Sequence, residues 1–118
     1  MLVSLADQHK IAFYKSRDLK SWSEISQFGN LGDTSNVWEC PDLFPLIAEN
    51  GQEYWVLIQN MNPGNPNGGS GTQYFIGQFD GKEFKVDENF TKLLGKQGAV
   101  VPEGFVFEDF EKIDFFFI

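Results

Sequence analysis

The sequence has few of the residues that bind zinc or form disulfides. It contains a single cysteine, Cys40, and a single histidine, His9, among 118 residues. One cysteine forms no disulfide within the chain, and one cysteine with one histidine supplies too few ligands of these types for a zinc site. We therefore expect neither redox nor zinc chemistry.

Basic residues are also scarce. Nine Lys and Arg stand against 17 Asp and Glu, which gives a net charge of −8 at pH 7. A charge of this sign repels both a nucleic-acid backbone and an anionic membrane surface. We therefore expect no nucleic acid and no membrane among the partners, and we interpret the acidic residues as a solvated surface.

Long apolar runs are missing as well. No run approaches the ~20 residues that span a bilayer, and residues 1–6 lack the basic start and the length of a secretory signal. We therefore recognise no targeting signal in this sequence, and the protein's location, whether cytoplasmic, periplasmic or secreted, stays open.

Aromatic residues and glycine are abundant instead. The chain has 13 Phe, 3 Trp, 3 Tyr and 12 Gly, a composition that favours strands and tight turns. No segment has the pattern of an amphipathic helix, so the sequence predicts an all-β fold. The expected strands form groups of three, four and then one or two: 1–6, 9–16 and 22–28; 37–47, 53–60, 72–79 and 82–86; 105–108 and 113–118.

The connections between these segments support a meander. Asp80-Gly81 is a dipeptide that suits a two-residue type I′ turn, and residues 62–71 are too rich in Pro, Gly and Asn for anything but a loop. Pro41 and Pro45 predict an irregular or edge-like strand over 37–47, because proline cannot donate to a ladder. Four-stranded meanders are typical of propeller blades, although a β-sandwich fits the strand count nearly as well.

Three stretches resemble glycoside hydrolase family 32, the family of invertases, levanases and inulinases. Residues 38–44 read Trp-Glu-Cys-Pro-Asp-Leu-Phe and resemble the family's Glu-Cys-Pro block. Residues 62–81, Asn-Pro-Gly-Asn-Pro-Asn through Phe-Asp-Gly, are similar to the loop and hairpin that follow that block, and residues 4–22 to the strand pair that precedes it. The resemblance covers nearly the whole chain.

The resemblance implies part of a five-bladed β-propeller built from antiparallel four-stranded meander blades. On this map residues 1–30 are part of blade two, 35–95 are blade three, and 100–118 begin blade four. The family's Asn-Asp-Pro-Asn motif, which holds the nucleophilic Asp, and its Arg-Asp-Pro motif are both absent from the sequence. Two stretches are similar to these motifs but do not match them. Asn65-Pro66-Asn67 lacks the Asp, and Arg17-Asp18-Leu19 lacks the Pro. We therefore expect a fragment of a longer enzyme.

The resemblance also implies roles for Glu39 and Cys40. Glu39 matches the general acid/base, which would protonate the leaving oxygen and then activate water, and Cys40 would lie beside the sugar. An isolated Glu is more often an ion-pair partner at a strand end, and a lone Cys is more often buried and inert. Apolar surroundings and a neighbouring carboxylate would favour the protonated acid, and Trp38, Cys40 and the family's nucleophilic Asp would supply them. In this chain we expect Glu39 beside Cys40 at the inner end of its blade, in a shallow pocket that missing chain leaves open. Asp42 lies three positions further on, and in a regular strand it would face the opposite side and fix the backbone.

The resemblance thus implies a fragment of a retaining hydrolase that acts on β-fructofuranosyl bonds of a fructan or of sucrose. Such an enzyme needs no cofactor, and with Glu39 as its single catalytic carboxylate this chain would be inactive alone. Levan, inulin and sucrose are not distinguished, and self-association through exposed blade edges stays open. The alternative is a non-catalytic β-sheet module that binds carbohydrate or another protein.

Overall fold

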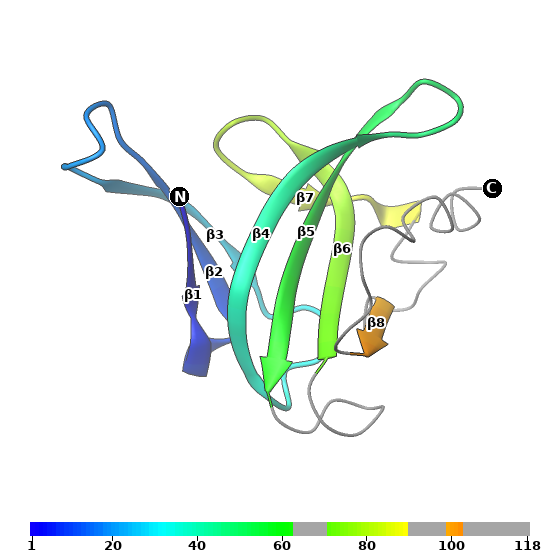
Figure 1. Ribbon diagram of the computed structural model, residues 1–118, viewed down its shortest axis with the longest axis horizontal. Helices are drawn as coiled ribbons and strands as arrows, with labels where there is room; N and C mark the ends of the chain where they lie inside the picture. Colours follow the sequence, from blue (N-terminus) through cyan, green and yellow to red (C-terminus); the bar gives the residue numbers. More distant parts are fainter. Residues whose placement is uncertain (63–70, 90–98, 103–118) are drawn as a thin grey trace.

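The computed structural model describes residues 1–62 and 71–89, and the backbone of residues 99–102 (Figure 1). These residues form eight β-strands and one short 3₁₀ helix, η1 (Ala6–Gln8). The strands are antiparallel to their neighbours in two sheets. The all-β prediction is therefore confirmed, and the segments 105–108 and 113–118 lie outside the described residues.

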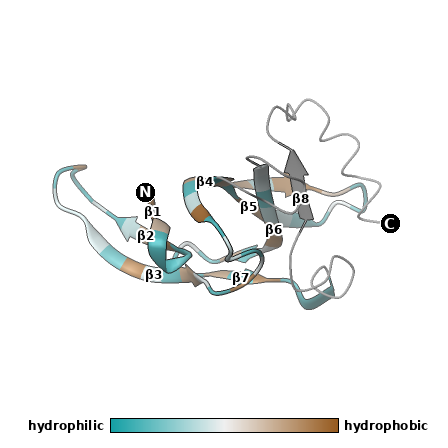
Figure 2. Cartoon of the chain, turned by 90° about the horizontal axis from the view of Figure 1, so that it is seen from below, coloured by the Kyte–Doolittle hydropathy of each residue, from teal (hydrophilic) through white to brown (hydrophobic). Residues whose placement is uncertain are grey.

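The first sheet contains three strands in sequence order: β1 (Leu2–Leu5), β2 (Lys10–Lys15) and β3 (Ser23–Gly29). The turn from η1 into β2 ends at His9, which has a left-handed backbone with φ of 52°. The β2–β3 hairpin extends away from the rest of the described chain, and its tip is mostly hydrophilic apart from the exposed Leu19 (Figures 1 and 2).

The second sheet contains the four strands that the sequence predicts as one meander. They are β4 (Val37–Ile47), β5 (Glu53–Asn62), β6 (Gly71–Phe79) and β7 (Phe84–Val86), and they are adjacent in that order. A fifth strand, β8 (Ala99–Pro102), pairs with β6 at residues 71–74. The sequence analysis does not predict this strand.

The turn between β6 and β7 differs from the expected type I′ turn. Gly81 has a positive φ of 87°, but Asp80 is not among the residues with positive φ, and a type I′ turn needs both. The carboxylate of Asp80 instead accepts hydrogen bonds from the main-chain N–H groups of Lys82 and Glu83, each at 2.8 Å. The hairpin is therefore longer than two residues and is held by its own aspartate.

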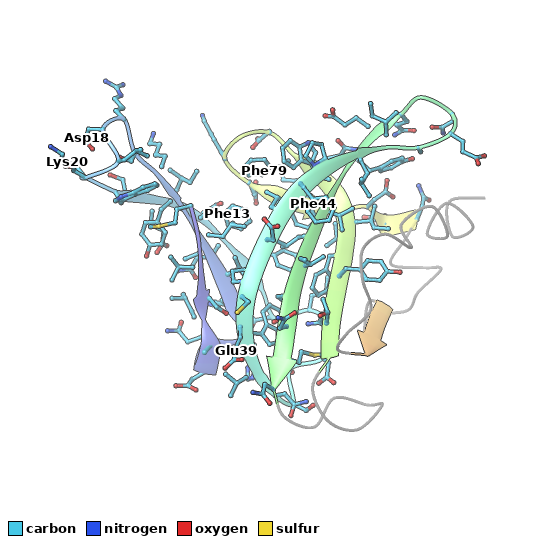
Figure 3. The ribbon with its side chains drawn as sticks, in the orientation of Figure 1. Phe13, Asp18, Lys20, Glu39, Phe44 and Phe79 are labelled. Carbon is cyan, nitrogen blue, oxygen red and sulfur yellow. The ribbon has the colours of Figure 1, made fainter. Side chains whose placement is uncertain are left out.

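The main hydrophobic core lies between the two sheets. Alternate residues of each strand face this core, among them Ile11 and Phe13 of β2, Leu57 of β5 and Phe75 of β6. The ring of Phe13 stacks on Phe79 with centroids 5.7 Å apart, which joins β2 of the first sheet to β6 of the second (Figure 3). A second cluster covers the other face of the second sheet and consists of Val56, Ile58, Tyr74 and Ile76, with Phe44 packed against it.

Candidate active site

Glu39 lies on β4, the edge strand of the second sheet, opposite Asn60 of β5. Strand β1 of the first sheet is in contact with β4, and Glu39 lies near the end of β4 that adjoins β1 (Figure 3). The side chain of Glu39 is exposed. Among the described residues Glu39 therefore lacks the apolar enclosure that would favour its protonated form. A carboxylate in this position is accessible to a substrate.

A β-bulge follows Glu39 directly. Glu39 and Asp42 are three positions apart on β4, whereas their partners Asn60 and Ile58 are only two positions apart on β5. Strand β4 therefore carries one extra residue here. Cys40 lies in the bulge with φ of 47°, in the left-handed region that residues other than glycine seldom occupy. The bulge interrupts the strand at the point where Pro41 could not have donated to the ladder, which confirms the predicted irregular strand.

The bulge also changes the expectation for Asp42. The alternation of a regular strand would place Glu39 and Asp42 on opposite sides, but the extra residue breaks that alternation. The opposite-side prediction therefore does not hold. Asp42 does fix its own backbone, because one carboxylate oxygen accepts a hydrogen bond from the N–H of Leu43 at 2.8 Å.

Cys40 is a free and exposed cysteine. The burial that is usual for a lone cysteine is therefore not found here. The thiol lies next to Glu39 on the same irregular part of β4. Both residues singled out from the sequence are thus brought together on one accessible stretch of main chain.

Trp38 precedes Glu39 and anchors it to the protein interior. Its side chain is fully buried, and its indole Nε1 donates a hydrogen bond to the main-chain oxygen of Asp33 at 2.8 Å. The hydroxyl of Ser4 on β1 donates a hydrogen bond to the main-chain oxygen of Trp38 at 2.6 Å. The ring of His9 meets the Trp38 ring edge-on, with centroids 6.2 Å apart. Side chains from β1 and from the turn after it therefore hold the residue before Glu39.

The loop before β4 is held by a buried glutamine. Gln73 of β6 is fully buried, and its side-chain oxygen accepts a hydrogen bond from the N–H of Asp33 at 2.8 Å. Gly32 has φ of 82°, and a Cβ there would lie 2.5 Å from the Gln73 oxygen, so only glycine fits. Ser4, Asp33 and Gln73 are not predicted from the sequence, because the bonds from Ser4 to Trp38 and from Asp33 to Gln73 join residues 34 and 40 positions apart and no local pattern signals them.

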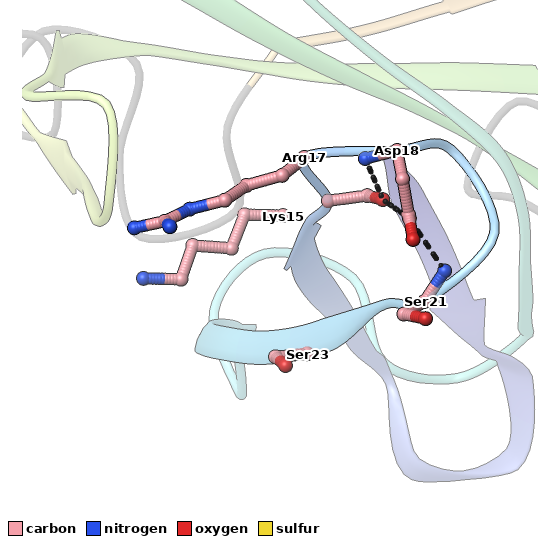
Figure 4. A pocket seen from close by; sticks show the side chains of 6 residues that line it. Lys15, Arg17, Asp18, Ser21 and Ser23 are labelled. Carbon is pink, nitrogen blue, oxygen red and sulfur yellow. Dashed lines mark hydrogen bonds between the residues drawn. The ribbon is translucent and has the colours of Figure 1, made fainter.

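Two of the hollows among the described residues can be described by their lining, and Glu39 lines neither of these two. One, of about 510 Å³, lies between the sheets and is lined by both apolar and charged residues, including Leu2, Phe13, Asp42, Leu43 and Trp55. The other, of about 390 Å³, lies at the β2–β3 hairpin and is lined by residues 15–18, Ser21 and Ser23 (Figure 4).

The hairpin hollow is built by a turn and not by catalytic groups. Asp18 accepts hydrogen bonds from the N–H groups of Lys20 at 2.9 Å and Ser21 at 2.8 Å and from the hydroxyl of Ser16 at 3.0 Å. These donors, the Ser21 and Lys20 N–H groups first, lower the pKa of Asp18 from 3.8 to about 2. Asp18 therefore closes the turn, in agreement with the interpretation of residues 17–22 as a polar hairpin.

Within the described ranges, no group of three or more Asp, Glu, His or Cys side chains could hold a metal ion. The same ranges contain no helix long and apolar enough to cross a bilayer.

Two packed antiparallel sheets, each a meander, with edge strands β1 and β4 in contact, have the arrangement of neighbouring blades in a β-propeller. The model of the glycosyl hydrolases family 32 N-terminal domain matches residues 1–101. The chain belongs to this family, and its fold is part of the family's five-bladed propeller.

Individual relatives agree with this assignment. The chain is 47% identical to an extracellular exo-inulinase of Aspergillus niger over 90 residues, which are 74% of this chain and 17% of the relative. It is 43% identical to a levanase of Bacillus subtilis over 93 residues, 76% of this chain and 14% of the relative. The crystal structure of an exo-inulinase from Aspergillus awamori superposes with a TM-score of 0.71 at 42% identity, covering 75% of this chain and 18% of that one. The chain thus spans less than a fifth of these relatives.

Proposed function

We propose that this chain is the acid/base segment of a retaining hydrolase that cleaves β-fructofuranosyl bonds. The observation that carries the proposal is the placement of Glu39, which is exposed on a bulged strand while the residue before it is fully buried and anchored. A general acid needs this combination, because it must reach the substrate from a fixed backbone. The Glu-Cys-Pro block at residues 39–41 and the membership of family 32 support the assignment.

Glu39 would serve both steps of the reaction. In the first step a second carboxylate attacks the anomeric carbon, and Glu39 donates its proton to the oxygen of the leaving sugar. In the second step Glu39, now ionised, takes a proton from water as the water attacks the fructosyl–enzyme ester. The two carboxyl groups of a retaining enzyme lie roughly 5–5.5 Å apart. The Asn-Asp-Pro-Asn motif of the family's nucleophile is absent from the sequence, so the second carboxylate would come from further chain.

The blade assignment is part of the same proposal. Residues 1–30 would be part of blade two and residues 35–95 blade three, which is supported by the groups β1–β3 and β4–β7 in separate sheets. Residues 100–118 are expected from the sequence to begin blade four; the first of them, in β8, pair with β6 of the second sheet, so blade four would begin after β8. Unpaired backbone groups on exposed blade edges would also allow self-association.

The proposed substrate is a fructan or sucrose. The relatives named as exo-inulinase and levanase support this class without separating levan, inulin and sucrose for the present chain. Cys40 would lie beside the sugar, which its exposure next to Glu39 supports. The proposed chemistry needs no cofactor, because both steps use only carboxyl groups and water.

The test compares Glu39→Gln with Glu53→Gln in the full-length enzyme that contains this segment. Glu53 is also exposed on the second sheet, but it pairs with Ile47 at the other end of β4. We expect Glu39→Gln to lower kcat for sucrose or inulin by ~10²–10⁴-fold with little change in sugar binding, since the amide has no acidic proton. Glu53→Gln should leave kcat unchanged. Wild-type turnover by Glu39→Gln would refute the proposal.

The isolated 118-residue chain gives a second test. We expect it to release no fructose, because Glu39 alone can form no glycosyl–enzyme. Fructose release that Glu39→Gln abolishes would show that the chain already holds a complete site. If the isolated chain binds sugar and the full-length protein shows no turnover, the alternative of a non-catalytic binding module is favoured.

A further inference from the structure

The peptide group that joins Trp38 to Glu39 is held from the neighbouring sheet. Strand β4 pairs with β5 along one edge, and β1 of the first sheet is in contact with β4. From β1, the hydroxyl of Ser4 donates a hydrogen bond to the main-chain oxygen of Trp38 at 2.6 Å. Because a peptide group is planar, the atom that Ser4 holds is rigidly connected to the nitrogen of Glu39.

The two sides of Glu39 differ in how they are constrained. On the N-terminal side, the indole of Trp38 is buried and bound to Asp33, and its carbonyl is bound to Ser4. On the C-terminal side, Cys40 has a left-handed backbone inside the bulge, without the regular ladder that fixes an ordinary strand. The bond from Ser4 therefore fixes the peptide nearest to Glu39, next to a stretch that the ladder leaves irregular.

We propose that Ser4 is a positioning residue for the acid/base Glu39. This inference rests on the proposed function of Glu39 and adds a role for a residue that contacts no reacting atom. A catalytic group must stay within ~0.5 Å of its working position, and a 1 Å displacement can lower the rate by about 10²-fold. Without the Ser4 hydroxyl, the Trp38–Glu39 peptide loses its cross-sheet partner and Glu39 samples positions from which proton donation is slower.

The chain offers a matched control in Ser26. The hydroxyl of Ser26 on β3 donates a hydrogen bond to the main-chain oxygen of Lys82, in the hairpin between β6 and β7. Like Ser4, it joins the first sheet to a carbonyl of the second. This hairpin lies at the β7 edge of the second sheet, whereas Glu39 lies on the opposite edge strand, β4. Ser26→Ala therefore removes the same kind of bond without touching the Glu39 peptide.

The experiment uses two substrates that differ in their need for an acid. A fructoside with an alkyl leaving group, such as sucrose, needs protonation of the leaving oxygen, whereas an aryl fructoside with an acidic phenol leaves almost without it. The value of kcat/KM reports the first chemical step. For Ser4→Ala in the full-length enzyme we expect about a 10-fold lower kcat/KM on sucrose, with the aryl fructoside changed less than about twofold. Ser26→Ala should change neither.

A second pair of variants separates the hydroxyl from the shape of the side chain. Ser4→Thr keeps the hydroxyl and Ser4→Val replaces it with a methyl group of similar size, and both β-branched residues suit a strand. We expect Ser4→Thr to retain the sucrose activity and Ser4→Val to reproduce the loss. This pair also decides the question if Ser4→Ala does not fold.

The outcomes distinguish the inference from the proposed function beneath it. Equal losses of Ser4→Ala on both substrates, or equal activities of Ser4→Thr and Ser4→Val, would overturn the positioning role. If Glu39→Gln shows the substrate-dependent loss and Ser4→Ala does not, the inference alone fails. If Glu39→Gln shows no such dependence, the proposed function fails first.

Discussion

Trp38 Nε1 lies 2.8 Å from the main-chain oxygen of Asp33 and donates a hydrogen bond to it, which closes the loop before β4 over the buried indole. The same Asp33 is bound through its N–H to the fully buried Gln73. The placement of Glu39 in space therefore depends on tertiary contacts of residues that lie outside the Glu-Cys-Pro motif.

This network gives a prediction for the stability of the chain. Trp38→Phe leaves the part-buried Asp33 oxygen without its indole donor and creates a small cavity, so we expect a loss of about 2–3 kcal/mol in the free energy of unfolding. Trp22→Phe is the matched control, because Trp22 is 36% exposed and its Nε1 donates to the Leu19 oxygen at 3.3 Å. It should cost less than about 0.5 kcal/mol. Urea denaturation measures both, and equal costs would contradict the anchoring role of Trp38.

The left-handed backbone of Cys40 gives a second prediction. With φ of 47°, this position disfavours a β-branched side chain more strongly than an unbranched one. We expect Cys40→Val to be less stable than Cys40→Ala by about 1–2 kcal/mol, although valine is the better residue for a regular strand. Thermal or urea unfolding of the two variants checks this, and a more stable valine variant would show that residue 40 has an ordinary extended backbone.

The third prediction concerns the pH dependence of the β2–β3 hairpin. Main-chain N–H groups and the Ser16 hydroxyl bind the ionised Asp18 and lower its pKa from 3.8 to about 2. A carboxyl group whose pKa is lowered on folding stabilises the folded state above its unfolded pKa, so this contribution is lost as the pH falls from about 4 to about 2. NMR titration should show the Asp18 carboxyl titrating near pH 2, and Ser16→Ala should raise that value. Titration near pH 4 in the wild type would show that the turn does not form.

The strand order could be predicted because local patterns determine it. The continuous apolar run within residues 53–60 and the turn at Asp80-Gly81 predict neighbouring antiparallel strands, which the structure contains. The exact turn type was wrong because the Asp80 carboxylate, and not a pair of left-handed residues, closes it. The strand β8 was missed because residues 99–102 have only a weak apolar pattern, and their pairing with β6 is a long-range contact.

The candidate site was predictable only in part. The motif identifies Glu39 and Cys40, but the bulge that follows Glu39 depends on the pairing of β4 with β5, so strand alternation gave the wrong relation between Glu39 and Asp42. The exposure of Glu39 could not be read from the motif either, because it depends on which distant elements pack against β4. Ser4 could not be recognised, since a serine in a strand gives no sign of a partner 34 residues away.

The central claim is that Glu39 is the acid/base residue, and azide rescue tests it most directly. In Glu39→Ala, the fructosyl–enzyme formed from an aryl fructoside with an acidic phenol lacks the base that activates water, so it accumulates and turnover is slow. Azide is a charged nucleophile of small size that needs no base. Adding azide to the full-length Glu39→Ala enzyme should therefore restore turnover and yield a fructosyl azide. A Glu39→Ala enzyme that hydrolyses the aryl fructoside at the wild-type rate, or forms no fructosyl azide, would contradict the account.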